Sequence, residues 1–286
     1  MTSVLVYEHL TATSAGGGPG PLSASLLREG RAMLDAVTAD LATLPDTTFQ
    51  IASSADALVQ QAAAADFTLI IAPECDGLLL DLATRVVAAG GTLLGPSPAA
   101  IRLTADKLLL FEWWTRQSVP TPATREYDGR PVQRPTVVKP RDGAGSQATK
   151  LLQPGHVFSE AWPGPLIAQH YVEGLAASVS FLCGPAGVTP LRPCEQLLSE
   201  DGRFAYLGGR AISDAALADR AVVIATKAVS GIPGLLGYAG VDVILGIDGH
   251  DWAIEINPRL TTSYVGLRAM TDQNLMGAML AAVRFV

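Results

Sequence analysis

Short apolar runs alternate with amphipathic stretches over the first third of the chain. Residues 3–7 and 67–72 are runs of mostly aliphatic side chains, which are typical of strands buried on both faces of a parallel sheet. Residues 23–44 and 78–89 carry apolar positions every three or four residues, a period that predicts helices. A further short strand is predicted at residues 92–94. This alternation of strands and helices predicts an α/β unit built on a parallel sheet.

A second pattern, near the C-terminus, predicts a β-hairpin that carries two carboxylates. Residues 241–245 and 252–256 are predicted strands, and Asp248-Gly249 between them is a strong signal for a two-residue turn. That turn would place Asp242 directly opposite Glu255, with both side chains on the same face as Asn257. The residues expected to face the core instead are Val241, Val243, Leu245, Trp252, Ile254 and Ile256.

The two carboxylates and Asn257 form the strongest candidate for a binding site. Like charges placed directly opposite each other destabilise a sheet, so this pair calls for a compensating partner. Carboxylate and amide oxygens are hard ligands that suit Mg²⁺, which keeps waters and substrate phosphates as the rest of its shell. A Mg²⁺ site is one interpretation of the hairpin, and a solvated face that binds no metal is the other.

Two lysines and a loop of small residues precede this hairpin. If Thr104 is the N-cap of a helix, Lys107 lies in the first turn, where a cation is unfavourable unless an anion such as phosphate is close. Lys139 ends an apolar run, where an ammonium without an anionic partner is costly to bury. The loop at residues 141–147 leaves backbone N–H groups open to phosphate oxygens, although it is not a Walker A sequence. A surface lysine and an ordinary hairpin connection are the simpler alternatives.

Taken in order along the chain, these motifs resemble the ATP-grasp enzymes, which activate a carboxylate as an acyl phosphate and pass it to a nucleophile, usually an amine. The resemblance implies ATP and Mg²⁺ as cofactors, with Mn²⁺ as an alternative metal. It implies that Asp242, Glu255 and Asn257 hold the metal and that Arg259 assists phosphoryl transfer. The residues it assigns to the nucleotide phosphates are Lys107, Lys139, Gly143, Ala144, Gly145 and Ser146.

The nucleoside is assigned by the same resemblance. Gln169 and the backbone of Val172 are expected to hold adenine, since they lie in a strand and hinge similar to those of the family. Many relatives bind ribose with a glutamate after the hinge, but Ala176 occupies that position here. Glu173 is the candidate substitute, and another mode of ribose binding is the alternative.

The fold class expected is α/β, an α+β ATP-grasp fold with the nucleotide bound between two lobes. A Rossmann-like parallel-sheet domain is expected at residues 1–95, a lobe with the lysines and glycine loop at 96–166, and a C-terminal lobe with the metal site at 167–286. Open parallel sheets bind ligands beyond the carboxyl ends of their strands. Glu8 and Glu74 lie there and are candidates for a substrate ammonium, unless they are solvated loop carboxylates.

Three hydroxyls follow the hairpin and have two interpretations. Thr261, Thr262 and Ser263 can bind the acceptor carboxylate through side chains and turn amides, or they can cap a helix at residues 265–270. Neither interpretation is favoured by the sequence.

Composition restricts the class of partner. Hydrophobic residues make up 49% of the chain and charged residues 16%, which predicts a globular protein. The net charge of −7, without a long basic run, argues against nucleic acid. The sequence shows neither a signal peptide nor a run of about 18 uncharged apolar residues, so export and a membrane span are not expected. The three cysteines fit reduced thiols in the cytoplasm, and a homodimer is left open.

One branch of the family is especially similar. The string from Glu255 to Leu267, together with Tyr7-Glu8 and residues 26–33, resembles the tyramine–glutamate ligases of methanofuran biosynthesis and related proteins of one-carbon coenzyme pathways. The resemblance implies a carboxylate–amine ligase, with glutamate and tyramine, tyrosine or a related amine as small-molecule substrates, in methanofuran, methylofuran or tetrahydromethanopterin biosynthesis. A D-alanine–D-alanine-like or other dipeptide ligase and an inactive nucleotide-binding regulator are the alternatives.

Overall fold

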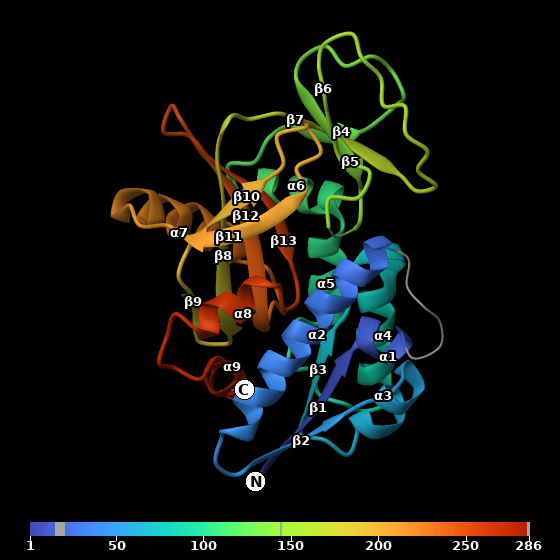
Figure 1. Cartoon of the computed structure of the whole chain (residues 1–286), viewed down its shortest axis with the longest axis vertical. Coiled ribbons are helices and arrows are strands. Elements are labelled where there is room, and N and C mark those ends of the chain that lie inside the picture. Colours follow the sequence, from blue (N-terminus) through green and yellow to red (C-terminus); the bar gives the residue numbers. More distant parts are fainter. Residues whose placement is uncertain (15–20, 144, 285–286) are drawn as a thin grey trace.

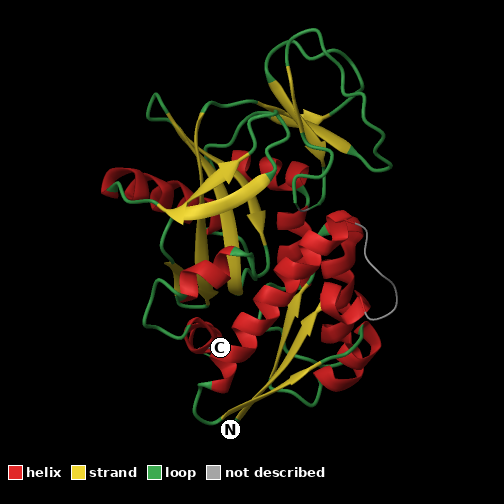
Figure 2. Cartoon of the chain, in the orientation of Figure 1, coloured by secondary structure: helices red, strands yellow, loops and turns green. Residues whose placement is uncertain are grey.

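Three β-sheets and the helices packed on them organise the described part of the chain (Figure 1). The computed structural model describes residues 1–14, 21–143 and 145–284. One sheet lies in the N-terminal unit, a small sheet lies at the opposite end of the molecule, and the largest sheet lies between them and to one side. Figure 2 shows that helices cover the first and the largest sheets, whereas long loops surround the small one.

The N-terminal unit confirms the predicted parallel sheet. Its strands β1 (Thr2–Glu8), β2 (Thr47–Ile51) and β3 (Phe67–Ile71) pair in the order β2-β1-β3, all parallel. Alternate residues of β1 and β3 face two separate cores, one against α2 (Pro21–Ala42) and one against α4 (Leu78–Ala88). The shorter elements of the unit are α1 (His9–Thr13), α3 (Ala55–Ala62) and the 3₁₀ turn η2 (Cys75–Gly77).

The strand predicted at residues 92–94 is wrong. This segment makes only one isolated parallel bridge, between Thr68 and Leu93. Two hydrogen bonds, Thr68 N to Thr92 O and Leu94 N to Thr68 O, fix it beside β3. The chain turns away after Leu94 towards Ser97, the N-cap of the next helix, so the pairing does not extend.

A helical break, rather than a single helix, precedes Lys107. Helix α5 (Pro98–Ala105) ends one residue before Asp106, which caps α6 (Lys107–Arg116) by accepting from the N–H groups of Leu108 and Leu109. The prediction that Thr104 is the N-cap is therefore wrong. Thr104 is buried in the last turn of α5, where its hydroxyl donates to the carbonyl of Ala100 instead.

The small sheet carries Lys139 at the end of a strand. Its strands β4 (Thr124–Glu126), β5 (Thr136–Pro140), β6 (Lys150–Leu152) and β7 (Leu166–His170) are antiparallel, in the order β4-β7-β5-β6. Its own apolar core is small, and the loop after β5 leads from this sheet towards the N-terminal unit.

The large sheet carries the predicted hairpin. Its six strands are β8 (Gly174–Gly184), β9 (Gly187–Pro190), β10 (Cys194–Leu198), β11 (Tyr206–Ala211), β12 (Gly237–Gly246) and β13 (Asp251–Asn257). Helices α5, α6 and α7 (Ala215–Val229) enclose the largest core against one face of this sheet. The opposite face of the large sheet lies towards the N-terminal unit and the small sheet.

The last two helices join the large sheet to the N-terminal unit. Helices α8 (Ser263–Arg268) and α9 (Leu275–Val283) pack against α2 in a core shared with β1, β3, Leu182 and Tyr238. Asp40 of α2 is buried there, and its carboxylate accepts from the hydroxyl of Tyr264 at 2.5 Å and from both Nε and Nη2 of Arg268. These polar contacts fix α8, and thus the segment that follows the hairpin, against the first unit.

Candidate active site

The hairpin confirms the predicted pair but not the predicted turn. Asp242 of β12 pairs with Glu255 of β13. The loop, however, contains three residues between Gly246 and His250, because Gly249 N donates to Gly246 O and Gly246 N donates to His250 O. The two-residue turn at Asp248-Gly249 is therefore wrong. A β-bulge between Asp242 and Val243 restores the pairing that the simpler turn would have given.

The bulge also changes which side chains face the core. Val241, Val243 and Leu245 are buried as predicted, but on β13 their companions are Ala253 and Ile256. Ile254 lines a cavity on the other face of the sheet, next to Glu255, and Trp252 is only partly buried. The core prediction for Trp252 and Ile254 is wrong, since strict alternation fails across an extra residue.

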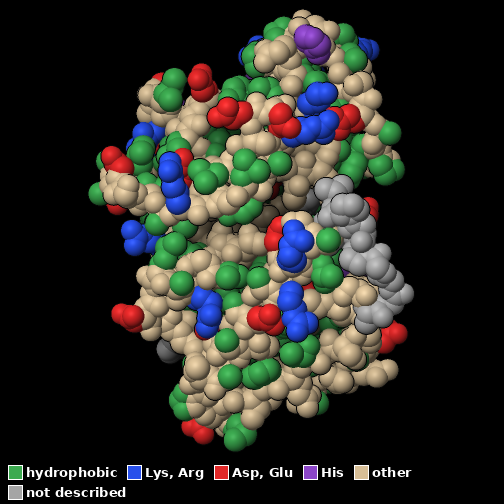
Figure 3. All heavy atoms as spheres, in the orientation of Figure 1, with side chains coloured by type: hydrophobic (Ala, Val, Ile, Leu, Met, Phe, Trp, Pro, Cys, Tyr) green, Lys and Arg blue, Asp and Glu red, His purple; other side chains and the backbone are tan. Residues whose placement is uncertain are grey.

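A cleft of about 410 Å³ lies against this face and collects residues from all three sheets and from α6. Most of the candidate residues line it: Glu8, Lys107, Lys139, Gly143, Gly145, Ser146, Gln169, Val172, Asp242, Glu255, Asn257, Arg259, Thr261, Thr262 and Ser263. Glu74 and Glu173 do not line it, and Glu173 is exposed to solvent. Ala144 lies outside the described residues. On the face shown in Figure 3, acidic and basic side chains are interspersed.

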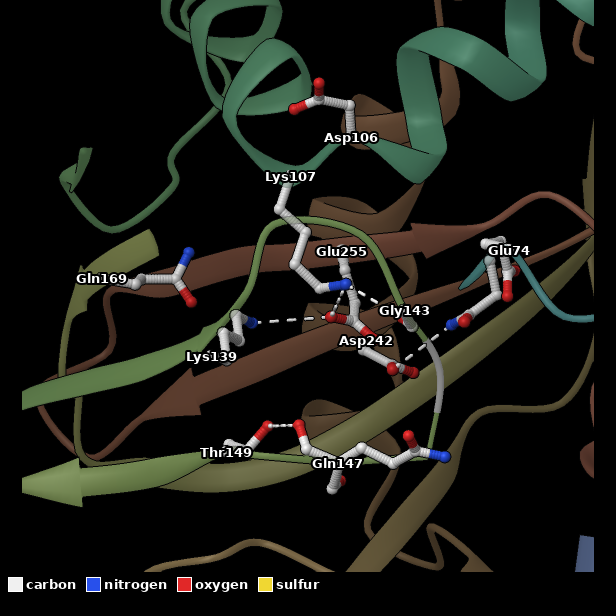
Figure 4. A network of polar contacts seen from close by, with 12 residues as sticks. Glu74, Asp106, Lys107, Lys139, Gly143, Gln147, Thr149, Gln169, Asp242 and Glu255 are labelled. Atoms are coloured by element: carbon white, nitrogen blue, oxygen red, sulfur yellow. Dashed lines mark hydrogen bonds and ion pairs between the residues drawn. The ribbon is translucent and has the colours of Figure 1, made fainter. Parts of the chain in front are cut away.

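Both candidate phosphate lysines converge on one carboxylate oxygen (Figure 4). Lys107 Nζ lies 3.7 Å and Lys139 Nζ 3.5 Å from Oε2 of Glu255, and Lys107 also donates to the carbonyl of Gly143. Burial lowers the pKa of Lys139, and Glu255 offsets part of this effect. Burial alone would raise the pKa of Glu255, but the two lysines outweigh it and hold that pKa below its ordinary value. The three side chains form a largely buried cluster, with Glu255 the most exposed at 23%, and the cluster has one more positive than negative charge.

Asp242 is the second carboxylate of the site. Burial, together with the charge of Glu255, raises the pKa of Asp242 to about 7. Its oxygens accept from Gln196 Nε2 at 2.9 Å and from Asn257 Nδ2 at 3.4 Å. A divalent cation would stabilise the ionised form of both carboxylates, because its positive charge offsets their mutual repulsion.

The donor set fits Mg²⁺. Within the described ranges there is no group of three or more His, Cys, Asp or Glu side chains that could hold a metal ion. The hairpin instead offers two carboxylates and an amide oxygen, which leaves room in an octahedral shell for waters and phosphate oxygens. Mg²⁺ is usually bound in this way, by few protein ligands together with a substrate.

The glycine loop adopts the conformations that its composition permits. Gly143 and Gly145 have positive φ angles of 136° and 75°, so a side chain at either position would be strained. Ser146 also has a positive φ, of 57°, and its hydroxyl donates to the carbonyl of Phe204 before β11. The loop therefore crosses the cleft from the small sheet to the large one.

The end of the cleft near β7 is less polar. Gln169 is buried, and its amide Nε2 donates to the hydroxyl of Thr124 at 3.0 Å. The apolar side chains that line the cleft near it include Val137, Val172, Ala176, Ile244 and Ile254. Such a surface suits an aromatic base better than a phosphate chain.

Family models identify the architecture. The model of the ATP-grasp domain matches residues 104–263, which include both lysines, the glycine loop and the hairpin. The chain belongs to the ATP-grasp family. A model of the pre ATP-grasp 3 domain matches residues 26–101, within the N-terminal unit. The predicted fold class is thus confirmed.

Two curated relatives are similar over most of the chain. Tyramine–L-glutamate ligase of Methanocaldococcus fervens is 34% identical over 203 residues, and that of Methanocaldococcus jannaschii is 32% identical over 206 residues. Each match covers 71% of this chain but only 62% and 58% of the respective relatives. The similarity to this branch of the family is therefore confirmed, whereas less than two thirds of either relative is matched.

Solved structures show the same ATP-grasp architecture over nearly the whole chain. A protein from Archaeoglobus fulgidus assigned to the ATP-grasp superfamily is 26% identical, with a TM-score of 0.76 over 99% of this chain and 89% of its own. D-alanine–D-alanine ligase from Bacillus anthracis, solved with ATP, is 15% identical, with a TM-score of 0.68 over 99% of this chain and 97% of its own. The second likeness concerns the fold alone.

Two contacts of the ATP-grasp site were not predicted from the sequence. Gln196 binds Asp242 from β10, and Glu74 binds Arg259 across 185 residues of chain. No local pattern links Gln196 to Asp242 or Glu74 to Arg259, because the members of each pair lie on segments far apart in the chain. Pairing between distant loops becomes visible only when the sheets are assembled.

Proposed function

We propose that this protein is an ATP-dependent ligase that joins a carboxylate to an amine through an acyl phosphate. The observation that carries the proposal is the convergence of Lys107 and Lys139 on Glu255, in the same cleft as Asp242. Two cations with little exposure to solvent, beside two adjacent carboxylates, form a site for a polyphosphate and a divalent ion together. The relatives named as tyramine–L-glutamate ligases and the family match support the same reaction class.

The cleft residues have separate roles in this reaction. Lys107, Lys139 and the loop from Gly143 to Ser146, with Ala144 among its members, hold the phosphates. Asp242, Glu255 and Asn257 would hold Mg²⁺, or Mn²⁺ in its place. The metal would neutralise charge on the phosphate oxygens when bound.

The chemistry needs no nucleophile from the protein. A carboxylate oxygen of the first substrate attacks the γ-phosphorus, and the bond to ADP breaks. The amine nitrogen then attacks the acyl carbon, loses a proton, and inorganic phosphate leaves. Arg259 faces the cleft and would stabilise charge on the phosphoryl group in transfer. Catalysis therefore rests on positioning and electrostatics.

Adenine and ribose would lie at the less polar end of the cleft. Gln169 and the backbone of Val172 lie there and are proposed to bind adenine. Glu173 is exposed and does not line the cleft, so a ribose contact would require it to turn inward. Another mode of ribose binding stays open.

For the organic substrates we propose glutamate and an amine such as tyramine or tyrosine, in the biosynthesis of a one-carbon coenzyme. The names of the relatives and the wall of the cleft support this choice. Leu10, Leu26 and Met33 form an apolar wall near Glu8, which suits an aromatic amine. Glu8 is the better-placed of the two candidate ammonium ligands, because it lines the cleft and Glu74 does not. The carboxylate oxygens of Glu8 also accept from the backbone N–H groups of Leu10 and Thr11, so an ammonium would bind to their remaining lone pairs.

The other end of the substrate cleft carries hydroxyls. Thr261, Thr262 and Ser263 line it at the start of α8, where they can bind a substrate carboxylate. Thr261 already contacts the hydroxyl of Tyr238, which leaves Thr262 and Ser263 more available. A cytoplasmic location and small-molecule partners remain expectations. None of the described helices is long and apolar enough to cross a membrane.

A phosphate-release screen tests the proposal. The protein is incubated with ATP, Mg²⁺ and pairs drawn from carboxylates, including glutamate and D-alanine, and amines, including tyramine and tyrosine. Release that requires both members of a pair, with the amide found by mass spectrometry, is the expected result. Release with D-alanine alone would favour a dipeptide ligase. Tight ATP binding without release for any pair would favour a nucleotide-binding regulator and overturn the proposal.

A further inference from the structure

Glu74 is a buried carboxylate of the N-terminal unit that reaches the ATP-grasp cleft only through another side chain. It follows β3 and is 5% exposed. Its Oε2 accepts from Nε of Arg259 at 3.0 Å, and its Oε1 is buried without a hydrogen-bond partner in the described part of the chain. A buried carboxylate with one unsatisfied oxygen is costly, so the fold stabilises it through Arg259.

The loop that carries Glu74 is itself fixed. Asp76 and Gly77 have positive φ angles of 54° and 68° in η2, where they turn the chain into α4. The N–H of Asp76 donates to Oδ2 of Asp142, at the start of the glycine loop. The segment therefore contacts both elements of the phosphate site, the glycine loop through Asp76 and Arg259 through Glu74.

The contacts of Arg259 leave one edge of its guanidinium for a ligand. Nε binds Glu74, and Nη1 donates to the carbonyl of Leu260 at 3.0 Å. Among the described residues Nη2 donates no hydrogen bond, and Arg259 lines the cleft that contains Glu255. The side chain is only 14% exposed. Two of its three nitrogens thus anchor the group, and the third is free to donate into the cleft.

We infer that Glu74 is a positioning residue, which holds Arg259 so that Nη2 faces the phosphoryl group in transfer. The inference rests on the proposed ligase function only for the identity of that group. It gives the N-terminal unit an indirect role in phosphoryl transfer, which acts through Arg259 and needs no contact between Glu74 and the nucleotide.

A purely electrostatic role and a purely structural role for Glu74 lead to different outcomes. If Glu74 acts mainly through its charge, it weakens anion binding by Arg259, and its removal would strengthen that binding. If it only joins two parts of the molecule, its removal would lower stability and leave the cleft unaffected. The pair of Asp40 and Arg268 is a matched control, because it also joins the N-terminal unit to the C-terminal helices and does not line the cleft.

The test measures ADP affinity with Mg²⁺, in the presence and absence of aluminium fluoride, a mimic of a phosphoryl group in transfer. It needs no organic substrate. The fluoride-dependent tightening is compared by calorimetry in the full-length wild-type protein and in Glu74→Ala, Glu74→Gln and Asp40→Asn. Glutamine keeps an oxygen that accepts from Nε but removes the charge, and so serves as the conservative variant.

We expect Glu74→Ala to reduce the tightening at least tenfold while ADP affinity alone changes less than twofold. Glu74→Gln should recover most of the loss, and Asp40→Asn should lower the melting temperature without changing the ratio. Retained tightening in both Glu74 variants, stronger tightening in either, or no tightening in the wild type would overturn the inference. If Glu74→Ala does not fold, Glu74→Gln against Asp40→Asn still decides between charge and position. A failed substrate screen with tightening intact would overturn the ligase alone.

Discussion

Replacing Lys107 by methionine removes one of the two cations that lie on Glu255 when no nucleotide is bound. At 3.7 Å, the attraction between Lys107 and Glu255 is about 4.5 kcal/mol for an effective dielectric constant of about 20. The cost of dehydrating both groups offsets most of this gain. We therefore expect the lysine to weaken metal binding to this carboxylate by about 1–2 kcal/mol, which raises the dissociation constant of the metal about 5- to 30-fold.

The expected result is a change of opposite sign for two ligands. Without nucleotide, Lys107→Met should bind Mn²⁺ about 5- to 30-fold more tightly than the wild type, because Glu255 is no longer shared with that ammonium. The same variant should bind ATP more weakly, because it loses a charge-assisted phosphate contact. When ATP binds, the lysines move from Glu255 to the phosphates, which frees the carboxylate for the metal. Each ligand therefore strengthens the binding of the other.

Calorimetric titrations with Mn²⁺ alone, with ATP alone and with both would measure these affinities. Lys150→Met is the matched control, since Lys150 pairs with Glu160 at 3.8 Å, is more exposed, and does not line the cleft. Mn²⁺ affinity that falls or stays constant in Lys107→Met would refute the reasoning, because it would show that the lysine does not compete for the carboxylate.

Three further changes test other parts of the site. Glu255→Gln should abolish ADP formation in a protein that still folds but melts at a lower temperature, because Lys107 and Lys139 lose the carboxylate that they share; normal turnover would remove the metal assignment. Lys139→Ala should weaken ATP binding by about 1.5–3 kcal/mol in calorimetry, and an unchanged affinity would show that this lysine contacts no phosphate. Asp40→Asn should lower the free energy of unfolding in urea by about 1–2 kcal/mol, after a discount for the exposure of Arg268, and an unaltered midpoint would mean that the pair adds no stability.

The hairpin shows both the reach and the limit of inference from sequence. Strand periodicity and turn residues indicate which residues pair, and Asp242 does face Glu255. The turn is one residue longer than predicted, and the bulge corrects for it, so the right pair follows from a wrong register near the loop. The prediction of Ile254 in the core fails for the same reason. A bulge leaves no distinct trace in a pattern of period two, and only the packing of both faces reveals it.

Contacts between distant loops are beyond prediction for another reason. The family motif gives Arg259 a role and the strand ends give Glu74 a role, but the two are assigned to different ligands. Their ion pair depends on how the N-terminal sheet docks against the large sheet, and neither local propensity nor periodicity specifies that docking. By contrast, β1 and β3 of the N-terminal sheet follow directly from their buried apolar runs, whereas β2 is largely exposed, gives no such signal and was not predicted.

The bulge beside Ile254 separates the hairpin loop from the metal carboxylates. On the loop side of the bulge, the pairing is one residue out of step with the pairing at Asp242 and Glu255. A change of one residue in the loop can be absorbed by the loss of the bulge, without turning either carboxylate away from the cleft. Ile247 in this loop is 81% exposed. Residues 247–250 are thus a suitable point of insertion for a fluorescent reporter. The reporter would be attached to the two strands that carry the metal ligands, and its insertion would leave the pairing of Asp242 with Glu255 unchanged.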